Sequence, residues 1–237
     1  MLELRDIEFE VDGVKILRDI NLKVENEFLA ITGQNGGGKS TLAKIIAGIE
    51  KPTRGQIFLN GIDINAKSIT ERAKLGISFA FQQPVKFKGL EVIDLLKIAA
   101  GGKLKFNDAC NYLSAVGLCA RDYINREINS SLSGGELKRI EIATILARQS
   151  EIAIFDEPEA GIDLWSFKHL IKIFENLRKN ISRSLIIISH QERILRLADE
   201  IIVLKGGQII SRGDSKSLLP KIINDENIQK ECGKINV

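Results

Sequence analysis

The spacing of apolar and polar positions divides the chain into a β-rich start, a helical middle and a mixed end. In the first part, apolar residues alternate with polar ones or form short runs bounded by turn residues, which is typical of strands. The turns Asp12-Gly13 and Asn60-Gly61 are of the kind that joins antiparallel strands. The strands predicted here cover residues 2–11, 16–24, 28–32 and 55–59.

Between residues 83 and 130 the apolar spacing becomes that of helices. Apolar residues recur at intervals of three and four, which places them on one face of a helix. The two stripes are Val92, Leu95, Leu96 and Ala99, and then Ala109, Tyr112, Leu113 and Val116. We interpret this stretch as a helical subdomain inserted into an α/β core.

Strands alternate with helices in the last part of the chain, which implies an α/β fold with a mainly parallel sheet covered on both faces. A helix is also expected from about residue 39. The elements predicted here are a helix over 135–148, a strand over 152–155, a helix over 165–179, a strand over 184–189 and a strand pair over 200–210. The predicted organisation is one domain, with a core and an antiparallel β subdomain in residues 1–82 and 136–237 and the helical subdomain in residues 83–135.

Composition narrows the class of protein. A chain of 237 residues suits one large domain or one domain with a subdomain. The net charge of +3, from 34 basic and 31 acidic residues, is too small to argue for nucleic-acid or membrane binding. No apolar run approaches the roughly 20 residues of a membrane span, and no signal peptide is visible, so we expect a cytoplasmic protein without membrane insertion. Cys110, Cys119 and Cys232 lack metal-site spacing and are expected to be isolated thiols.

A glycine-rich loop, Gly33 to Ser40, follows a predicted strand and opens a predicted helix. Its sequence GQNGGGKS fits the GxxxxGK[ST] pattern of phosphate-binding loops. The glycines let backbone N–H groups turn inward around phosphates, and the helix N-terminus adds the positive end of its dipole. Lys39 is expected to reach the β- and γ-phosphates, and Ser40 to give its hydroxyl to Mg²⁺. Because motif and context agree, a merely flexible loop is disfavoured.

Two carboxylates, Asp156 and Glu157, end the strand predicted at residues 152–155. Asp156 is expected to hold Mg²⁺ through water. Glu157 is expected to polarise the attacking water as general base. Taken alone, the two acids could be solvated strand-end residues, but the phosphate loop in the same chain favours the catalytic interpretation.

A third motif, Ser133-Gly134-Gly135-Glu136, begins the helix predicted at about residue 135. A serine and two glycines at a helix start can form a second anion site, or only an N-cap.

These motifs, in this order, resemble those of the ABC-type ATPases. GQNGGGKST resembles the family's Walker A motif, IAIFDE its Walker B motif and LSGGE its signature motif. Residues 160–163 resemble its D-loop, Ser189-His190 its H-loop, and Gln82 falls at its Q-loop. The resemblance implies a P-loop NTPase fold, ATP hydrolysis with Mg²⁺ and an ATP-dependent homodimer. In that head-to-tail pair each ATP lies between one copy's phosphate loop and the other's signature loop, and hydrolysis opens the pair.

The same resemblance implies roles for individual residues. Glu157, His190, Gln82 and Lys39 would be catalytic, although a histidine after an apolar strand is also often a plain strand-end residue. Ser40, Gln82 and Asp156 would contact the metal. The nucleotide contacts would be Gly33, Gln34, Asn35, Gly36, Gly37, Gly38, Lys39, Ser40, Thr41 and Val11, with Ser133, Gly134, Gly135, Glu136 and Asp163. His169, on a predicted helix, is expected to be structural, and Trp165 and the phenylalanines are expected to be packing residues.

Three positions depart from the family pattern. Many members place an aromatic residue against adenine, where this chain has Val11, with Phe9 two residues earlier on what is expected to be the same strand face. Glu136 replaces the commoner Gln at the end of the signature motif. Glu159 stands where many members have Thr or Ser, and adds a negative charge near the site.

The stretch FAFQQPVKFKGL, residues 79–90, indicates which branch of the family the chain resembles. It resembles the same region of the SufC group, the ATPases of the SUF iron–sulfur cluster assembly machine. That likeness implies that SufB/SufD-like scaffold subunits bind at the Gln82–Leu90 region and the helical subdomain. Val85 and Phe87 would face the partner, or would pack under the helical subdomain. The alternative is the nucleotide-binding subunit of a membrane transporter, whereas a translation or repair ATPase would carry a second cassette or a long coiled coil.

Overall fold

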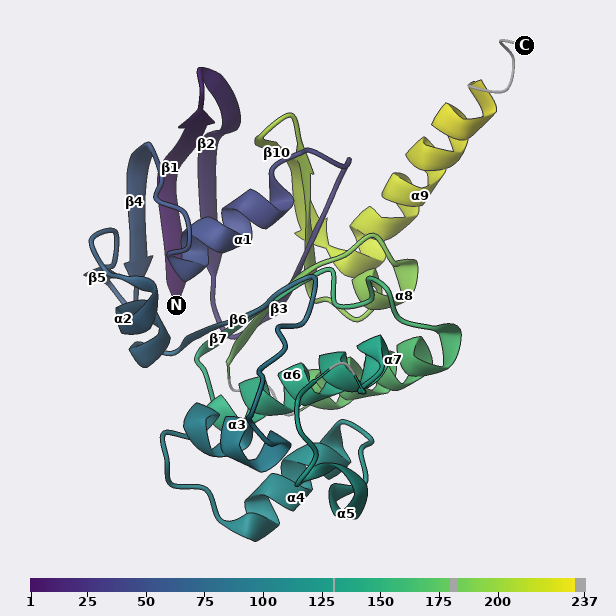
Figure 1. The fold of residues 1–237 in the computed structure, drawn as a ribbon. Coiled ribbons are helices and arrows are strands. Elements are labelled where there is room, and N and C mark those ends of the chain that lie inside the picture. The colour runs from purple at the N-terminus through teal and green to yellow at the C-terminus, as the bar shows by residue number, and fades with distance from the viewer. Residues whose placement is uncertain (130, 180–182, 233–237) are drawn as a thin grey trace.

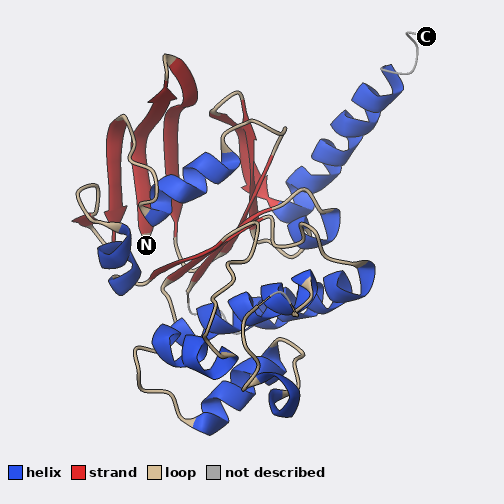
Figure 2. Ribbon diagram, in the orientation of Figure 1, coloured by secondary structure: helices blue, strands red, loops and turns tan. Residues whose placement is uncertain are grey.

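The computed structural model describes residues 1–129, 131–179 and 183–232, and in them the strands form two sheets (Figures 1 and 2). The strands are β1 (Leu2–Val11), β2 (Val14–Val24), β3 (Phe28–Thr32), β4 (Arg54–Leu59), β5 (Ile62–Asp63), β6 (Ile77–Ala80), β7 (Ile152–Asp156), β8 (Ser184–Ile188), β9 (Glu200–Lys205) and β10 (Gln208–Asp214). The antiparallel sheet has the order β2-β1-β4-β5. The larger sheet has the order β10-β9-β3-β8-β7-β6 and is parallel except for the pair β9–β10.

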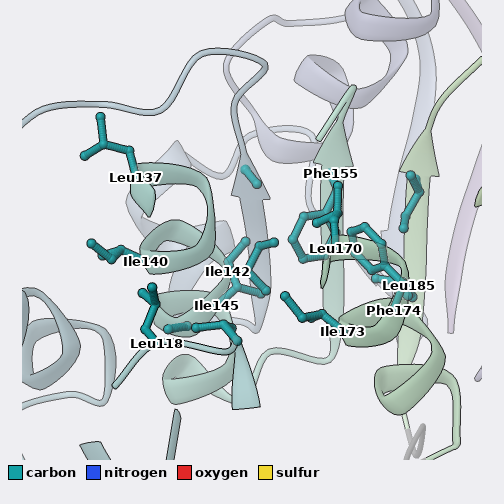
Figure 3. Packing of buried hydrophobic residues seen from close by; sticks show 14 of the residues in the cluster. Leu118, Leu137, Ile140, Ile142, Ile145, Phe155, Leu170, Ile173, Phe174 and Leu185 are labelled. Atoms are coloured by element: carbon teal, nitrogen blue, oxygen red, sulfur yellow. The ribbon is translucent and has the colours of Figure 1, made fainter. Parts of the chain in front are cut away.

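Helices cover both faces of the larger sheet. They are α1 (Lys39–Ala47), α2 (Ile69–Lys74), α3 (Val92–Ala99), α4 (Phe106–Ala115), α5 (Ala120–Tyr123), α6 (Gly134–Arg148), α7 (Leu164–Lys179), α8 (Glu192–Leu195) and α9 (Ser215–Cys232). One core cluster contains α1 together with strands of both sheets. The other joins the opposite face of the larger sheet to α6, α7 and the helices α3 and α4 (Figure 3).

The central strands are apolar at successive positions because both of their faces are buried. In β3, Phe28 and Ala30 belong to the cluster with α6 and α7, whereas Leu29 and Ile31 belong to the cluster with α1. Successive strand residues point to opposite faces, so a strand buried on both faces is apolar throughout. The parallel strands β3, β6, β7 and β8 therefore bring the loops that follow them to one edge of the sheet.

The predicted fold class is confirmed, with small differences in element boundaries. The parallel core, the antiparallel sheet, the helices at 92–115 and the turn at Gly206-Gly207 are all present. The helices α2, α8 and α9 were not predicted from the sequence. Within the described part of the chain, no helix has both the length and the apolar character that crossing a bilayer requires.

The prediction that Trp165 and the phenylalanines are packing residues is wrong for several of them. Trp165 is 72% exposed, and Phe81, Phe87 and Phe106 are exposed as well. Phe155 and Phe174 do pack, with ring centroids 5.3 Å apart between β7 and α7 (Figure 3). The predicted structural role of His169 finds no support in burial, because the residue lies exposed on α7.

Helix α2 begins with a capping box. The Ser68 hydroxyl accepts a hydrogen bond from Glu71 N at 3.3 Å, and the Glu71 carboxylate accepts one from Ser68 N at 2.8 Å. The Ser-x-x-Glu spacing is the sequence signal that could have predicted this helix.

Replacing Ser68 by Ala is expected to lower the free energy of unfolding by about 1 kcal/mol, because a helix N-terminal N–H loses its partner. Urea unfolding measures the change. The control is Thr70→Ala, which removes an exposed hydroxyl from inside the same helix. Equal stability of the two variants would contradict the capping role.

Candidate functional site

The phosphate loop joins β3 to α1, and its backbone needs glycine at particular points. Gly33 has φ +133°, and a Cβ added there would lie 1.9 Å from the Leu204 carbonyl oxygen. Gly38 has φ +94°, and a Cβ there would lie 2.6 Å from Leu17 Cδ2. Positive φ and close approach of β9 and β2 together restrict both positions to glycine.

Lys39 is buried at the start of α1 and turned back onto the loop. Its Nζ donates to the carbonyl oxygens of Gly33 and Gln34, both at 2.9 Å. Burial lowers the pKa of Lys39, and the nearby Glu157 and Asp156 oppose that shift. The ammonium group is thus held at the loop by two neutral acceptors, which phosphate oxygens could replace.

Asp156 and Ser40 meet where β7 ends beside α1. The Ser40 hydroxyl donates to Asp156 Oδ1 at 2.9 Å. Burial raises the pKa of the Asp156 carboxyl, Glu157 adds to the rise, and the bond from Ser40 opposes it. A hydroxyl and a carboxylate oxygen are ligands that suit Mg²⁺ when phosphate oxygens and water complete its shell. In the described residues no cluster of three or more His, Cys, Asp or Glu could hold a metal by itself.

The Glu157 carboxylate lies close to one residue from each of two other motifs. Gln82 Nε2 donates to Glu157 Oε2 at 2.6 Å, and His190 Nε2 lies 3.7 Å from Glu157 Oε1. Glu157 itself has φ +43°, a left-handed conformation that costs a non-glycine residue roughly 1–2 kcal/mol. The loops after β6, β7 and β8 thus converge on one carboxylate, as the sequence motifs predict.

The signature loop does not join this group within one chain. Ser133 is the N-cap of α6, because its hydroxyl accepts from Glu136 N at 3.2 Å. The Glu136 carboxylate accepts from Ser133 N at 2.7 Å and from the Tyr123 hydroxyl. A Cβ added to Gly134 would lie 3.5 Å from Gly161 O, so the loop lies against the D-loop of its own chain. The N-cap interpretation is confirmed, and the signature loop's role as an anion site stays a prediction.

Phe9 and Val11, predicted to share one face of β1, differ in burial. Phe9 is buried in the core, whereas Val11 is 44% exposed next to the turn. The register of β1 against β2 shifts between Phe9 and Glu10, where β2 carries one extra residue. Phe9 is therefore unavailable to a nucleotide base, and Val11 is left as the predicted adenine contact.

Glu159 has a partner that sequence reasoning missed. Ser189, the residue before His190, donates its hydroxyl to Glu159 Oε1, while the buried Glu159 Oε2 has no hydrogen-bond partner. Burial raises the pKa of Glu159, and the hydrogen bond from Ser189 opposes the rise. Ser189 Oγ also accepts from Gln191 N at 3.0 Å. The acid thus ties the loop after β7 to the loop that carries His190.

Replacing Glu159 by Gln is expected to stabilise the protein at neutral and higher pH. Because the folded-state pKa lies above the ordinary value of 4.5, the folded chain binds a proton more tightly than the unfolded chain. Stability is therefore lost as pH rises from 4.5 through the folded-state pKa, and the amide removes that loss. Urea midpoints at a series of pH values measure it, with the exposed Glu175→Gln as control. An advantage that shrinks as pH rises would contradict the assignment.

Comparison with known proteins agrees with this site. The family model for ABC transporters matches residues 17–160. An uncharacterized ABC transporter ATP-binding protein of Methanocaldococcus jannaschii, MJ0035, is 39% identical over 99% of this chain and 94% of its own length. The energy-coupling factor transporter ATP-binding protein EcfA1 of Mesomycoplasma hyopneumoniae strain 7448 is 39% identical over 90% of this chain and 78% of its own.

A solved structure shares the fold. The dimeric structure of a post-hydrolysis state of the ATP-binding cassette MJ0796, bound to ADP and Pi, has a TM-score of 0.80 and 25% identity. The match covers 91% of this chain and 99% of that one. The chain therefore belongs to the ABC transporter family, as an ATPase that binds ATP with Mg²⁺ and hydrolyses it.

Proposed function

We propose that two copies of the chain close head-to-tail on two ATP molecules. The observation that carries this is where the phosphate loop and the signature loop lie within one chain. The signature loop contacts its own D-loop at Gly161, whereas Lys39 and Glu157 lie at the phosphate-loop edge of the sheet. A second copy would bring its Ser133, Gly134 and Gly135 to that edge, and the MJ0796 cassette is dimeric in its ADP- and Pi-bound structure.

Within the closed pair we assign each predicted residue a task. Lys39 exchanges its loop carbonyls for the β- and γ-phosphate oxygens, and backbone N–H groups of residues 33–41 cradle the phosphates. Ser40, Asp156 and Gln82 would hold Mg²⁺, which would neutralise phosphate charge. Glu157 accepts a proton from water as the water oxygen bonds to the γ-phosphorus and the bond to the β,γ-bridging oxygen breaks. His190 holds the γ-phosphate and orients that water.

We further propose that the motor drives a SUF-type iron–sulfur scaffold. The supporting feature is the Gln82–Leu90 segment, which resembles the SufC group and leaves Val85 and Phe87 exposed. These two side chains line a hollow of about 160 Å³ whose other walls come from β6, α3 and α6. An apolar hollow beside the catalytic Gln82 suits a protein partner whose movement is coupled to ATP. Residues 83–135, as the helical subdomain, would transmit the motion.

The second candidate is a motor for membrane subunits. The name of EcfA1, a transporter ATP-binding protein, favours it. The same hollow would then receive a cytoplasmic segment of a permease.

Affinity purification of the tagged chain from its native host distinguishes the SUF proposal from the transporter alternative. The SUF proposal expects a stoichiometric soluble partner, and a complex that contains iron and acid-labile sulfide. Phe87→Asp should release that partner, while Ile62→Asp, an exposed site on β5 outside the helical subdomain, should keep it. Recovery of an integral membrane protein in place of the scaffold would overturn the SUF proposal in favour of the transporter.

A further inference from the structure

Two apolar side chains stand exposed at the start of α7, directly after the D-loop. Leu164 is 65% exposed and Trp165 is 72% exposed. The Nζ of Lys168 lies 4.7 Å from the centre of the Trp165 ring, a cation–π contact that favours one orientation of the ring. Adjacent exposed apolar residues, with a tryptophan among them, are typical of protein–protein contact sites.

The start of α7, named here the α7 corner, packs against the signature loop. Asp163 Oδ1 accepts from Trp165 N at 2.8 Å, and Asp163 Oδ2 accepts from the Ser166 hydroxyl at 2.7 Å. A Cβ added to Gly135 of the signature loop would lie 2.6 Å from that Ser166 hydroxyl. Because the contacts are this close, any placement of the signature loop on a second molecule also places Leu164 and Trp165 beside it.

A cavity with polar and apolar walls adjoins the phosphate loop on the side of α9. Its volume is about 490 Å³, and its polar lining includes Gln34, Asn35, His190, Lys205 and Lys221, with Gly33 beside them. Strands β9 and β10 and helix α9 supply its apolar walls through Val203, Ile210, Leu218 and Ile222. Ile210 is 57% exposed, which leaves apolar surface open on this face.

We propose that, in the ATP-bound pair, Trp165 and Leu164 of each copy insert into the α9 cavity of the other copy. The inference rests on the head-to-tail pair proposed above, in which one copy's signature loop covers the other's phosphate loop. That same phosphate loop lines the cavity through Gly33, Gln34 and Asn35, so the partner's α7 corner arrives next to it. The two-fold symmetry of such a pair makes the contact twice, and it couples α9 to the presence of ATP.

The chain contains one tryptophan, so its intrinsic fluorescence reports on Trp165 alone. In the Glu157→Gln protein, ATP and Mg²⁺ should shift the emission to shorter wavelength and reduce quenching by acrylamide. Both changes should follow protein concentration in step with dimer formation, measured by sedimentation on the same samples. Trp165→Ala in this background should weaken the dimer by about 30-fold, as for an interface hot spot.

A reciprocal variant and a control complete the test. Ile210→Asp, at an exposed cavity position, should weaken the dimer as Trp165→Ala does, while Phe106→Ala, exposed on α4, should leave it unchanged. A dimer in which Trp165 stays accessible to acrylamide, or which tolerates both variants, would overturn this inference alone. Absence of any ATP-dependent dimer in the Glu157→Gln protein would overturn the head-to-tail pair, and the inference with it.

Discussion

Replacing Glu157 by Gln is expected to lower ATP turnover by about 100- to 10,000-fold, the usual contribution of a general base. The amide cannot accept the proton of the attacking water, but its oxygen can still accept the hydrogen bond that Gln82 Nε2 now donates at 2.6 Å. ATP binding should therefore persist, and the pair should stay closed on its uncleaved nucleotide. Phosphate release measures turnover, and sedimentation with ATP and Mg²⁺ measures the trapped dimer.

The matched control for this experiment is Glu175→Gln, which neutralises an exposed carboxylate on α7. It should hydrolyse ATP at the wild-type rate. Near-normal phosphate release by the Glu157→Gln protein would overturn the general-base assignment. Loss of ATP binding in that protein would instead assign Glu157 a role in nucleotide affinity.

The phosphate loop and the two carboxylates could be predicted because each is recognised from a short, continuous stretch of sequence. Each motif lies within a few residues of a strand end, and a parallel sheet brings such ends together. The contacts between Gln82, Glu157 and His190 follow from that topology, although the residues are far apart in sequence. The resemblance to the ABC-type ATPases, together with this topology, was therefore enough to place this group.

Other features depend on packing that spacing does not encode. The burial of Phe9 in the core, which removes it from the predicted adenine face, depends on how the two sheets pack. Trp165 was expected to pack, yet its side chain is exposed at the start of α7. The structural role of Glu159 can be inferred only from its burial and from its hydrogen bond with Ser189, which lies 30 residues away in the sequence.

Replacing Lys39 by Ala is expected to weaken ATP binding by about 10- to 100-fold, because a charge-assisted hydrogen bond to phosphate contributes roughly 1.5–3 kcal/mol. Calorimetric titration with ATP and Mg²⁺ measures the affinity. Lys51→Ala, which removes an exposed positive charge, is the control and should bind as the wild type does. Unchanged affinity in the Lys39→Ala protein would contradict the phosphate-loop assignment.

Lys39 also has a structural task that the experiment must separate from binding. Its Nζ satisfies the carbonyl oxygens of Gly33 and Gln34, so its removal leaves those acceptors without that donor in the nucleotide-free protein. The Lys39→Ala protein should therefore unfold at a lower temperature than the wild type without nucleotide. Because the stabilisation by bound ATP grows with the logarithm of the ATP concentration relative to Kd, ATP should raise the unfolding temperature of the wild type much more than that of the variant. An equal rise in both would mean that Lys39 braces the loop and does not hold phosphate.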